Sequence, residues 1–326
     1  MDATAPLLEL DGVRTWFYTR EGVVRAVDGV SFSIAPGETL AVVGESGCGK
    51  SVTAQSILRL LPSPPARVVE GSIRFEGQDL LALDDAAMRD IRGNRIAMIF
   101  QEPMTSLNPV LTVGYQIAES LVRHQAMGRA DAEARAAEML ALVGIAEPAR
   151  RVREYPHQLS GGMRQRVVIA MALSCDPKLI VADEPTTALD VTTQDQVLEQ
   201  IVRLQQEFRM AMILVTHDLG VVAETCQRAL VMYCGRVAEK ADIGPLFAHP
   251  RHPYTAGLLQ SLPRVSQQAH QDLPVIPGMV PDLLDLPAGC RFAERCARRD
   301  TRCDRELPEL DGEAASPSRV ACFHPL

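Results

Sequence analysis

Residues 40–51 read LAVVGESGCGKS, and this stretch decides the fold. Its first four apolar residues predict a buried strand of a parallel sheet, which runs directly into the pattern G-x-x-x-x-G-K-S of a phosphate-binding loop. Because glycine has no Cβ atom, the loop backbone can turn its N–H groups inward around phosphate oxygens, and the following helix points its positive end at the same anion. The alternative is a glycine-rich turn that binds nothing, and the strand-loop-helix context argues against it.

The loop pattern assigns a role to individual side chains. Lys50 is expected to reach the β- and γ-phosphates, and Ser51 to offer its hydroxyl to Mg²⁺. We therefore expect ATP and Mg²⁺ as ligands. The nucleotide-binding residues predicted here are Gly44, Glu45, Ser46, Gly47, Cys48, Gly49, Lys50, Ser51 and Val52.

Length and charge limit the classes of protein to consider. A chain of 326 residues suits about two domains. The 41 acidic residues outnumber the 33 Lys and Arg, which argues against a nucleic-acid partner because binding a duplex takes roughly 6–10 cationic phosphate contacts. No apolar run approaches the ~20 residues of a membrane span, and the first residues lack the features of a signal peptide. A cytoplasmic protein is expected.

Strand-like segments flank the loop on both sides. Residues 7–13, 30–34, 71–75 and 96–100 read as strands. Gln101 follows the last of them, where a polar side chain beside a nucleotide can touch the metal or its water. An aromatic cluster lies at residues 16–18 (Trp16, Phe17 and Tyr18), and it either offers a ring to adenine or consists of half-buried strand residues.

The segment at 102–159 changes to helical periodicity, with apolar residues three and four apart at 113–123 and 130–143. Gly144 is a plausible end for the second helix. We expect an inserted helical subdomain. It is followed by Ser160, which can cap a helix that begins with Gly161 and Gly162, so a second anion-binding helix start is predicted.

Two further buried strands are expected to deliver polar residues to the same sheet edge. Residues 179–182 precede Asp183, which can hold Mg²⁺ through water, and Glu184, which can act as general base on the attacking water. Residues 212–216 precede His217. Taken alone, a single histidine is more often a packed or surface residue than a catalytic one.

Together, these motifs resemble the ATP-binding subunits of ABC transporters over residues 7–240, with LSGGMRQ at 159–165 as the most specific match. The resemblance implies a P-loop NTPase fold of class α/β with an antiparallel β subdomain. It implies that Phe17 stacks on adenine, that Glu184 is the catalytic base and that His217 contacts the γ-phosphate. It implies that Gln101 senses the metal and the permease, and that Asp190 contacts the other ATPase of a dimer. The residues implied to face the ATP of a partner ATPase are Ser160, Gly161, Gly162 and Gln165, and those implied for magnesium are Ser51, Gln101 and Asp183.

Two stretches narrow the resemblance to oligopeptide and dipeptide importers, a group that also includes nickel and other small-solute uptake systems. They are FQEPMTSLNPV at 100–110 and HPRHPYTAGLLQSLP at 249–263. The C-terminal cysteines resemble the cysteine-rich tails of that group, several of which are implicated in holding a [4Fe-4S] cluster. They are Cys290, Cys296, Cys303 and Cys322. Their spacing alone fits neither a structural zinc site nor a standard ferredoxin run, so iron–sulfur, zinc and no metal remain open.

The expected organisation is an ATPase domain at residues 1–248 and a C-terminal extension at 249–326. The resemblance implies two permease subunits, a second ATPase that is a copy or a paralogue, an indirect solute-binding protein outside the membrane, and a peripheral location on its cytoplasmic face. The rivals are a soluble ABC ATPase acting on nucleic acid and a binding module with a vestigial ATPase. Because the tail is far from the loop in sequence and poor in apolar residues, we expect it to have a structural or docking role.

Overall fold

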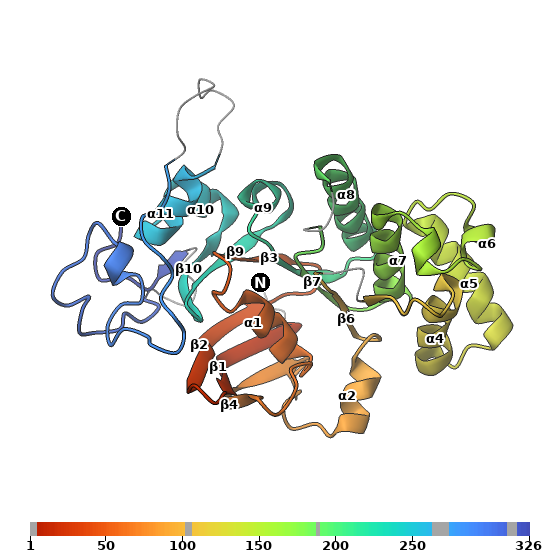
Figure 1. Ribbon diagram of the computed structural model, residues 1–326, viewed down its shortest axis with the longest axis horizontal. Helices are drawn as coiled ribbons and strands as arrows, with labels where there is room; N and C mark the ends of the chain where they lie inside the picture. Colours follow the sequence, from red (N-terminus) through yellow and green to blue (C-terminus); the bar gives the residue numbers. More distant parts are fainter. Residues whose placement is uncertain (1–4, 102–105, 187–189, 263–273, 312–317) are drawn as a thin grey trace. The chain divides into compact units, whose positions relative to one another are not determined.

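The structure is a computed structural model that describes residues 5–101, 106–186, 190–262, 274–311 and 318–326 (Figure 1). The chain forms two compact units. The first comprises Met1–Ile34, Thr39–Leu81 and Val215–Leu326, and the second comprises Ala35–Glu38 and Ala82–Leu214. The predicted domains at 1–248 and 249–326 follow a different division, which stays a prediction.

The first unit contains an antiparallel sheet, of order β2-β1-β4-β5, and four strands in the order β11-β10-β9-β3. In the second group β3 pairs with β9 in parallel, and β10 pairs antiparallel with both β9 and β11. In chain order the elements are β1 (Leu8–Tyr18), β2 (Val23–Ile34), β3 (Thr39–Val43), α1 (Lys50–Ile57), β4 (Ala66–Phe75), β5 (Gln78–Asp79), α9 (Leu219–Thr225), β9 (Arg228–Tyr233), β10 (Arg236–Asp242), α10 (Ile243–Ala248), α11 (Pro253–Gln260), η2 (Ala293–Arg295) and β11 (Ser318–Val320).

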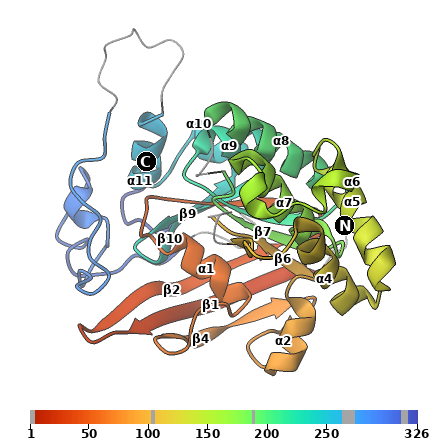
Figure 2. The ribbon, with the colours of Figure 1, turned by 45° about the vertical axis from the view of Figure 1, so that its right-hand side comes forward.

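The second unit combines strands in the order β8-β7-β6 with a group of helices. Its β6 and β7 pair in parallel, and both views show them as neighbours (Figure 1 and Figure 2). In chain order the elements are α2 (Asp85–Ile91), β6 (Ile96–Ile99), α4 (Val113–Gln125), α5 (Arg129–Leu142), α6 (Pro148–Arg151), η1 (Pro156–Gln158), α7 (Gly161–Leu173), β7 (Leu179–Asp183), α8 (Val191–Glu207) and β8 (Ala211–Val215).

The strands predicted from short apolar runs are confirmed, because every residue of β3, β7 and β8 is buried. Such runs mark parallel strands that are covered on both faces. The two predicted helices at 113–123 and 130–143 are confirmed as α4 and α5. Gly144, with a φ of +74°, ends α5 in the left-handed conformation that glycine tolerates best. Residues 102–105, where the predicted helical subdomain begins, lie outside the described residues.

The first two strands are longer than the sequence predicted. β1 continues through the aromatic cluster to Tyr18, and β2 starts at Val23, because the turn between them is closed by a hydrogen bond from Thr19 N to Gly22 O of 3.0 Å. Aromatic and β-branched residues favour such half-buried strands. The aromatic cluster is therefore part of the antiparallel sheet.

The cysteine-rich tail, residues 290–326, joins the core of the first unit instead of standing apart from it. Its strand β11 extends the sheet beside β10, and Phe292 is only 4% exposed. The Phe292 ring lies 5.3 Å from the Tyr233 ring and 5.4 Å from the Tyr254 ring, measured between centroids. Figure 1 shows the tail beside α11 and β10. The low apolar content of the tail did not predict this packing, because most of the apolar surface around Phe292 belongs to neighbouring residues outside the tail.

None of the helices in the described residues combines the length and the apolar character needed to cross a bilayer.

Candidate functional site

The phosphate-binding loop joins β3 to α1 and depends on glycine at two tight positions. A Cβ atom on Gly49 would lie 2.1 Å from Ala26 O, and one on Gly44 would lie 2.3 Å from Met232 O. Both glycines have positive φ angles, of +92° and +151°. Because any other residue would collide with neighbouring backbone, these two glycines fix the path of the loop.

Lys50 is held at the centre of this loop. Its side chain is buried, and Nζ donates hydrogen bonds to Gly44 O at 2.9 Å and Glu45 O at 3.0 Å. These bonds bring the ammonium group back over the loop it follows. The position suits a lysine whose charge faces the phosphates of a bound nucleotide.

Glu45 connects the loop to residues far along the chain. Its backbone N–H donates to the hydroxyl of Tyr254 at 2.8 Å. Its carboxylate accepts two hydrogen bonds from Arg295, with Nη1 2.6 Å from Oε2 and Nη2 3.0 Å from Oε1. The tail is far from the loop in sequence, yet Arg295 of the tail contacts the loop directly.

Phe17 is distinguished from its aromatic neighbours by the face of β1 on which it lies. Along β1, Thr15 and Phe17 share one face, while Trp16 lies on the other. Thr15 Oγ1 is 2.9 Å from Ser56 Oγ of α1, so this face meets the helix that starts at the loop. Trp16 is engaged elsewhere, with the guanidinium of Arg25 5.2 Å from its ring centroid. Phe17 therefore lies on the face of β1 that meets α1.

In the second unit, the predicted general base contacts the predicted sensing glutamine. Glu184 follows Asp183 at the end of β7, and Gln101 follows the end of β6. Gln101 Nε2 donates to Glu184 Oε2 at 3.0 Å. Glu184 adopts a left-handed backbone with a φ of +45°, an uncommon conformation that turns the chain sharply after the buried Asp183. Parallel strands ending side by side thus bring the two side chains together.

The signature motif begins α7 as predicted. Ser160 Oγ accepts a hydrogen bond from Met163 N at 3.3 Å, and Ser160 and Gly161 are exposed at the helix start. Gly162 lies close to α8, since a Cβ atom there would be 2.7 Å from Thr193 Cγ2. The helix start therefore presents unobstructed N–H groups to solvent.

Gln165, the last residue of the predicted signature set, lies inside the second unit. It is fully buried, and its Nε2 donates to Pro185 O at 2.5 Å. Its amide thus supports the chain just after Glu184. Its role toward a nucleotide of a partner ATPase stays a prediction.

Asp190 caps α8, and His217 follows β8. Asp190 Oδ1 accepts from Thr193 N at 3.0 Å, and Oδ2 accepts from Thr193 Oγ1 at 2.8 Å. His217 is exposed, between Thr216 and Asp218, the cap of α9. Residues 188 and 189, which precede Asp190 in the predicted motif, lie outside the described residues.

The four tail cysteines lie near one another in the first unit. Cys290 N donates to Cys303 O at 2.7 Å. Burial raises the pKa of the Cys290 thiol to about 11, and the three other tail thiols are close enough to act on it electrostatically in the same direction. Backbone N–H groups donate to two of the sulfurs, from Arg298 to Cys296 Sγ and from His324 to Cys322 Sγ, both at 3.4 Å. Sulfurs that accept such bonds are suited to soft-metal ligation.

A second set of candidate ligands overlaps with these cysteines. One side-chain atom each of Asp300, Cys303 and His324 lies within 4.8 Å of the others. His324 Nε2 is 2.7 Å from Asp300 Oδ2. Nitrogen and oxygen ligands beside a thiol favour zinc over an iron–sulfur cluster, so both metals predicted from the sequence keep candidate ligands.

Comparison with known proteins decides the family. Residues 27–187 match the family model described as ABC transporter, and residues 238–303 match that of the oligopeptide/dipeptide transporter C-terminal region. The oligopeptide transport ATP-binding protein AppD of Bacillus subtilis is 51% identical over 97% of this chain and 96% of its own length. The chain belongs to the ABC transporter ATP-binding proteins. It is therefore an ATP-binding and ATP-hydrolysing subunit with the P-loop NTPase fold.

Other relatives agree with this assignment to the ABC family. The dipeptide transport ATP-binding protein DppD of Bacillus subtilis is 52% identical over 93% of this chain and 90% of its own length. Among solved structures, a dimeric ATP-binding cassette in a post-hydrolysis state bound to ADP and Pi has a TM-score of 0.65 and 30% identity, covering 72% of this chain and 98% of that one. ABC ATPases of importers work as dimers with transmembrane permease subunits.

Two residues that hold the loop, Tyr254 and Arg295, were missed by the sequence analysis. Tyr254 belongs to the stretch 249–263 that carried the resemblance to peptide importers, but its pattern gave no link to the loop. Arg295 directly precedes Cys296 and was overlooked beside the cysteines. The position of Arg295 next to a candidate metal-ligating cysteine was the local feature that could have identified it.

Proposed function

We propose that this ABC ATPase powers the uptake of di- and oligopeptides from the cytoplasmic face of the membrane, where it is peripherally bound. The observation that carries the proposal is the match of residues 238–303 to a C-terminal region described for oligopeptide and dipeptide transporters, in addition to the cassette itself. Nickel or another small solute is the alternative cargo. Copurification of the chain with its membrane partners, identified by mass spectrometry, tests the proposal, and recovery of peptide permeases is the expected result.

In the proposed mechanism, the loop binds the nucleotide, and polar residues that follow the buried strands carry out hydrolysis. Lys50 and the N–H groups of the loop bind the phosphates, and Ser51 and Asp183 are the groups that would hold Mg²⁺, which neutralises phosphate charge. Glu184 accepts the proton of the attacking water, while the amide of Gln101 orients that carboxylate. Phe17 stacks on adenine and His217 contacts the γ-phosphate.

The proposed working unit has two ATPase subunits and two permease subunits. The exposed start of α7 at Ser160 and Gly161 would bind the ATP held by the other ATPase, because a helix start favours anions. Asp190, exposed beside it, would contact that partner. The second ATPase is a copy of this chain or a paralogue. A solute-binding protein outside the membrane would deliver the cargo to the permeases.

The permease is proposed to dock on the second unit near the segment 106–112, which precedes α4. Val110 in this segment is 74% exposed although it is apolar. The segment is held to α4 by the buried Gln116, whose Oε1 accepts from Asn108 N at 2.8 Å. A groove of about 500 Å³ lies next to it, between α4, α5 and α6, and is lined mostly by small side chains and Tyr115. A short helix fits such a groove.

Replacing Val110 by Asp is expected to abolish transport by the assembled importer while sparing the ATPase activity of the isolated subunit. The reason is that a charge at a docking surface disfavours the partner without touching the nucleotide. The matched control is Val122→Asp on α4, also exposed, which should transport normally. Loss of the isolated subunit's ATPase activity in Val110→Asp, or normal transport, would place docking elsewhere.

The cysteine tail is proposed to hold a metal centre, with a [4Fe-4S] cluster ahead of zinc. Cys290, Cys296, Cys303 and Cys322 would supply the four thiolates. The grouping of the thiols and the N–H bonds to two sulfurs support this assignment. Bound metal would tie together a segment that contains little regular structure.

Protein purified without oxygen is expected to be brown and to contain about four irons per chain. Cys296→Ser should be colourless and lack iron, whereas Cys226→Ser, which removes a buried thiol outside the tail, should keep both colour and iron. Metal analysis and absorption spectra provide the measurement. One zinc per colourless chain would assign the site to zinc, and protein without metal would overturn the proposal.

A further inference from the structure

The tail and the phosphate-binding loop meet through an ion pair that the known chemistry of the loop does not require. Arg295 is 3% exposed in its side chain and Glu45 is 30% exposed. A bidentate arginine–carboxylate pair of this kind fixes both the position and the orientation of the two side chains. The guanidinium also donates from Nε to Pro277 O at 2.9 Å, from Nη2 to Ile276 O at 3.3 Å, and from Nη1 to the Tyr233 hydroxyl at 3.3 Å. Arg295 is therefore itself rigidly held.

Glu45 places a negative charge within the loop that binds phosphates. The loop exists to bind several phosphate charges, and a free carboxylate in its second position would repel them. Pairing with Arg295 neutralises that charge and holds the carboxylate away from Lys50, whose Nζ uses the Glu45 carbonyl and not the carboxylate. The pair thus removes a repulsive charge and fixes one of the loop's residues.

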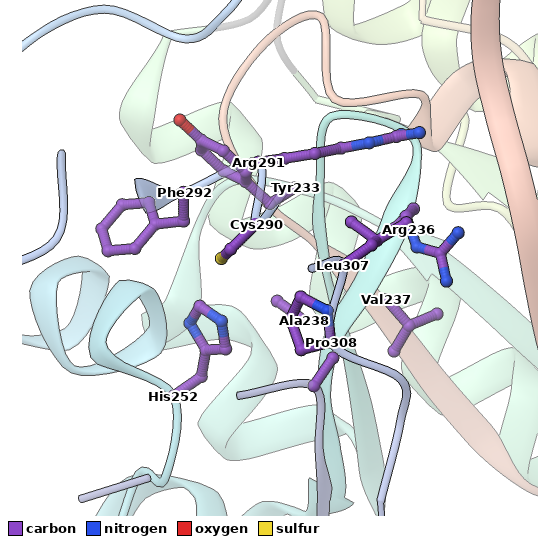
Figure 3. Close-up of a pocket in the computed structure, with 11 residues that line it drawn as sticks. Tyr233, Arg236, Val237, Ala238, His252, Cys290, Arg291, Phe292, Leu307 and Pro308 are labelled. Carbon is purple, nitrogen blue, oxygen red and sulfur yellow. The ribbon is translucent and has the colours of Figure 1, made fainter. Parts of the chain in front are cut away.

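A second arginine of the tail, Arg291, contacts the turn between β9 and β10. Arg291 is 6% exposed and pairs with Asp28 in β2, and it also donates to Cys234 O in the turn between β9 and β10. Figure 3 shows Cys290, Arg291 and Phe292 of the tail gathered with Tyr233 and His252 around a cavity of about 30 Å³. The tail is therefore joined to the core beside the loop by both charge pairs and ring packing.

We propose that Arg295 is a positioning residue for nucleotide binding, and that through it the cysteine-rich tail holds the phosphate-binding loop in its binding conformation. Arg295 immediately precedes Cys296, and Arg291 immediately follows Cys290. Order at the cysteines thus sets the position of the two arginines. The affinity of the subunit for nucleotide then depends on the state of its tail. The inference takes ATP binding by the loop as given and is independent of the transported solute.

The first test compares ATP dissociation constants of the purified full chain, measured with a fluorescent ATP analogue. Arg295→Ala should weaken binding by roughly tenfold, the size of effect expected when a charge-assisted hydrogen bond is lost. The matched control is Arg299→Ala, because Arg299 pairs with Asp304 inside the tail at 2.6 Å and does not contact the loop in the structure. It should bind as the unaltered chain does. Equal affinity of Arg295→Ala and the unaltered chain would overturn the inference.

A second variant separates positioning from simple loss of folding. Glu45→Gln removes the repulsive charge, so the double variant Glu45→Gln, Arg295→Ala should bind ATP several-fold more tightly than Arg295→Ala alone. Melting temperatures are measured in parallel, since a purely structural role would lower them without this rescue. A double variant no better than Arg295→Ala would overturn the electrostatic account. An unaltered chain that bound no nucleotide would overturn both this inference and the function assigned to the loop.

The proposed link between the cysteines and the phosphate-binding loop is tested by a further measurement of ATP affinity. Cys296→Ser should weaken ATP binding toward the value of Arg295→Ala, and combining the two should add little, because both release the same contact. Unchanged affinity in Cys296→Ser would overturn the link between the cysteines and the loop. Full additivity in the combined variant would overturn it as well.

Discussion

Replacing Glu184 by Gln is expected to cut ATP turnover by roughly 10²–10⁴-fold, the usual effect of losing a positioned general base. ATP binding should be nearly unchanged, because glutamine keeps the size of the side chain and its oxygen can still accept from Gln101. The structure sharpens this expectation, since Gln101 Nε2 donates to the Glu184 carboxylate at 3.0 Å. Steady-state hydrolysis and ATP affinity are the two measurements.

The matched control for Glu184→Gln is Glu138→Gln, which changes an exposed acid of α5 that pairs with Arg135. It should hydrolyse ATP at the normal rate. Because ATP stays bound, Glu184→Gln should accumulate as a closed dimer on size-exclusion chromatography in the presence of ATP. Near-normal hydrolysis by this variant would remove Glu184 from the role of base.

Replacing Lys50 by Ala should instead weaken nucleotide binding itself, by roughly 100-fold or more. Lys50 contributes a full charge to the phosphates, and hydrogen bonds to charged groups contribute about 1.5–3 kcal/mol each. Calorimetric titration with ATP gives the measurement. Lys240→Ala in β10 serves as the control, and it should bind normally.

The two variants are distinguished by the step they affect. Lys50→Ala loses binding and with it turnover, whereas Glu184→Gln loses turnover and keeps binding. If Lys50→Ala bound ATP as tightly as the unaltered chain, the lysine bonds to Gly44 O and Glu45 O would be structural only. The loop would then owe its affinity to backbone N–H groups alone.

The parts of the fold and site that could be predicted are those with local signals. The apolar runs that became β3, β7 and β8 are each followed by the polar residues that form the site, and periodicity alone placed α4 and α5. The helix cap at Ser160 follows from the residue types at the start of α7.

The parts that could not be predicted depend on contacts between distant residues. Glu45 and Arg295 are separated by 250 positions, and neither residue type signals the other. Gln165 belongs to a motif whose spacing is clear, yet its direction depends on which face of α7 packs inward. The apolar surface that buries Phe292 belongs to Tyr233 and Tyr254, so the tail's own composition could not reveal it.

The measurement that tests the central claim most directly is peptide uptake by the importer. The chain is copurified with its membrane partners, reconstituted into vesicles with a solute-binding protein, and supplied with labelled di- and oligopeptides. Uptake should require ATP on the side of this chain and should be lost with Glu184→Gln. Uptake without ATP, or ATP-driven uptake of nickel with no uptake of any peptide, would contradict the account.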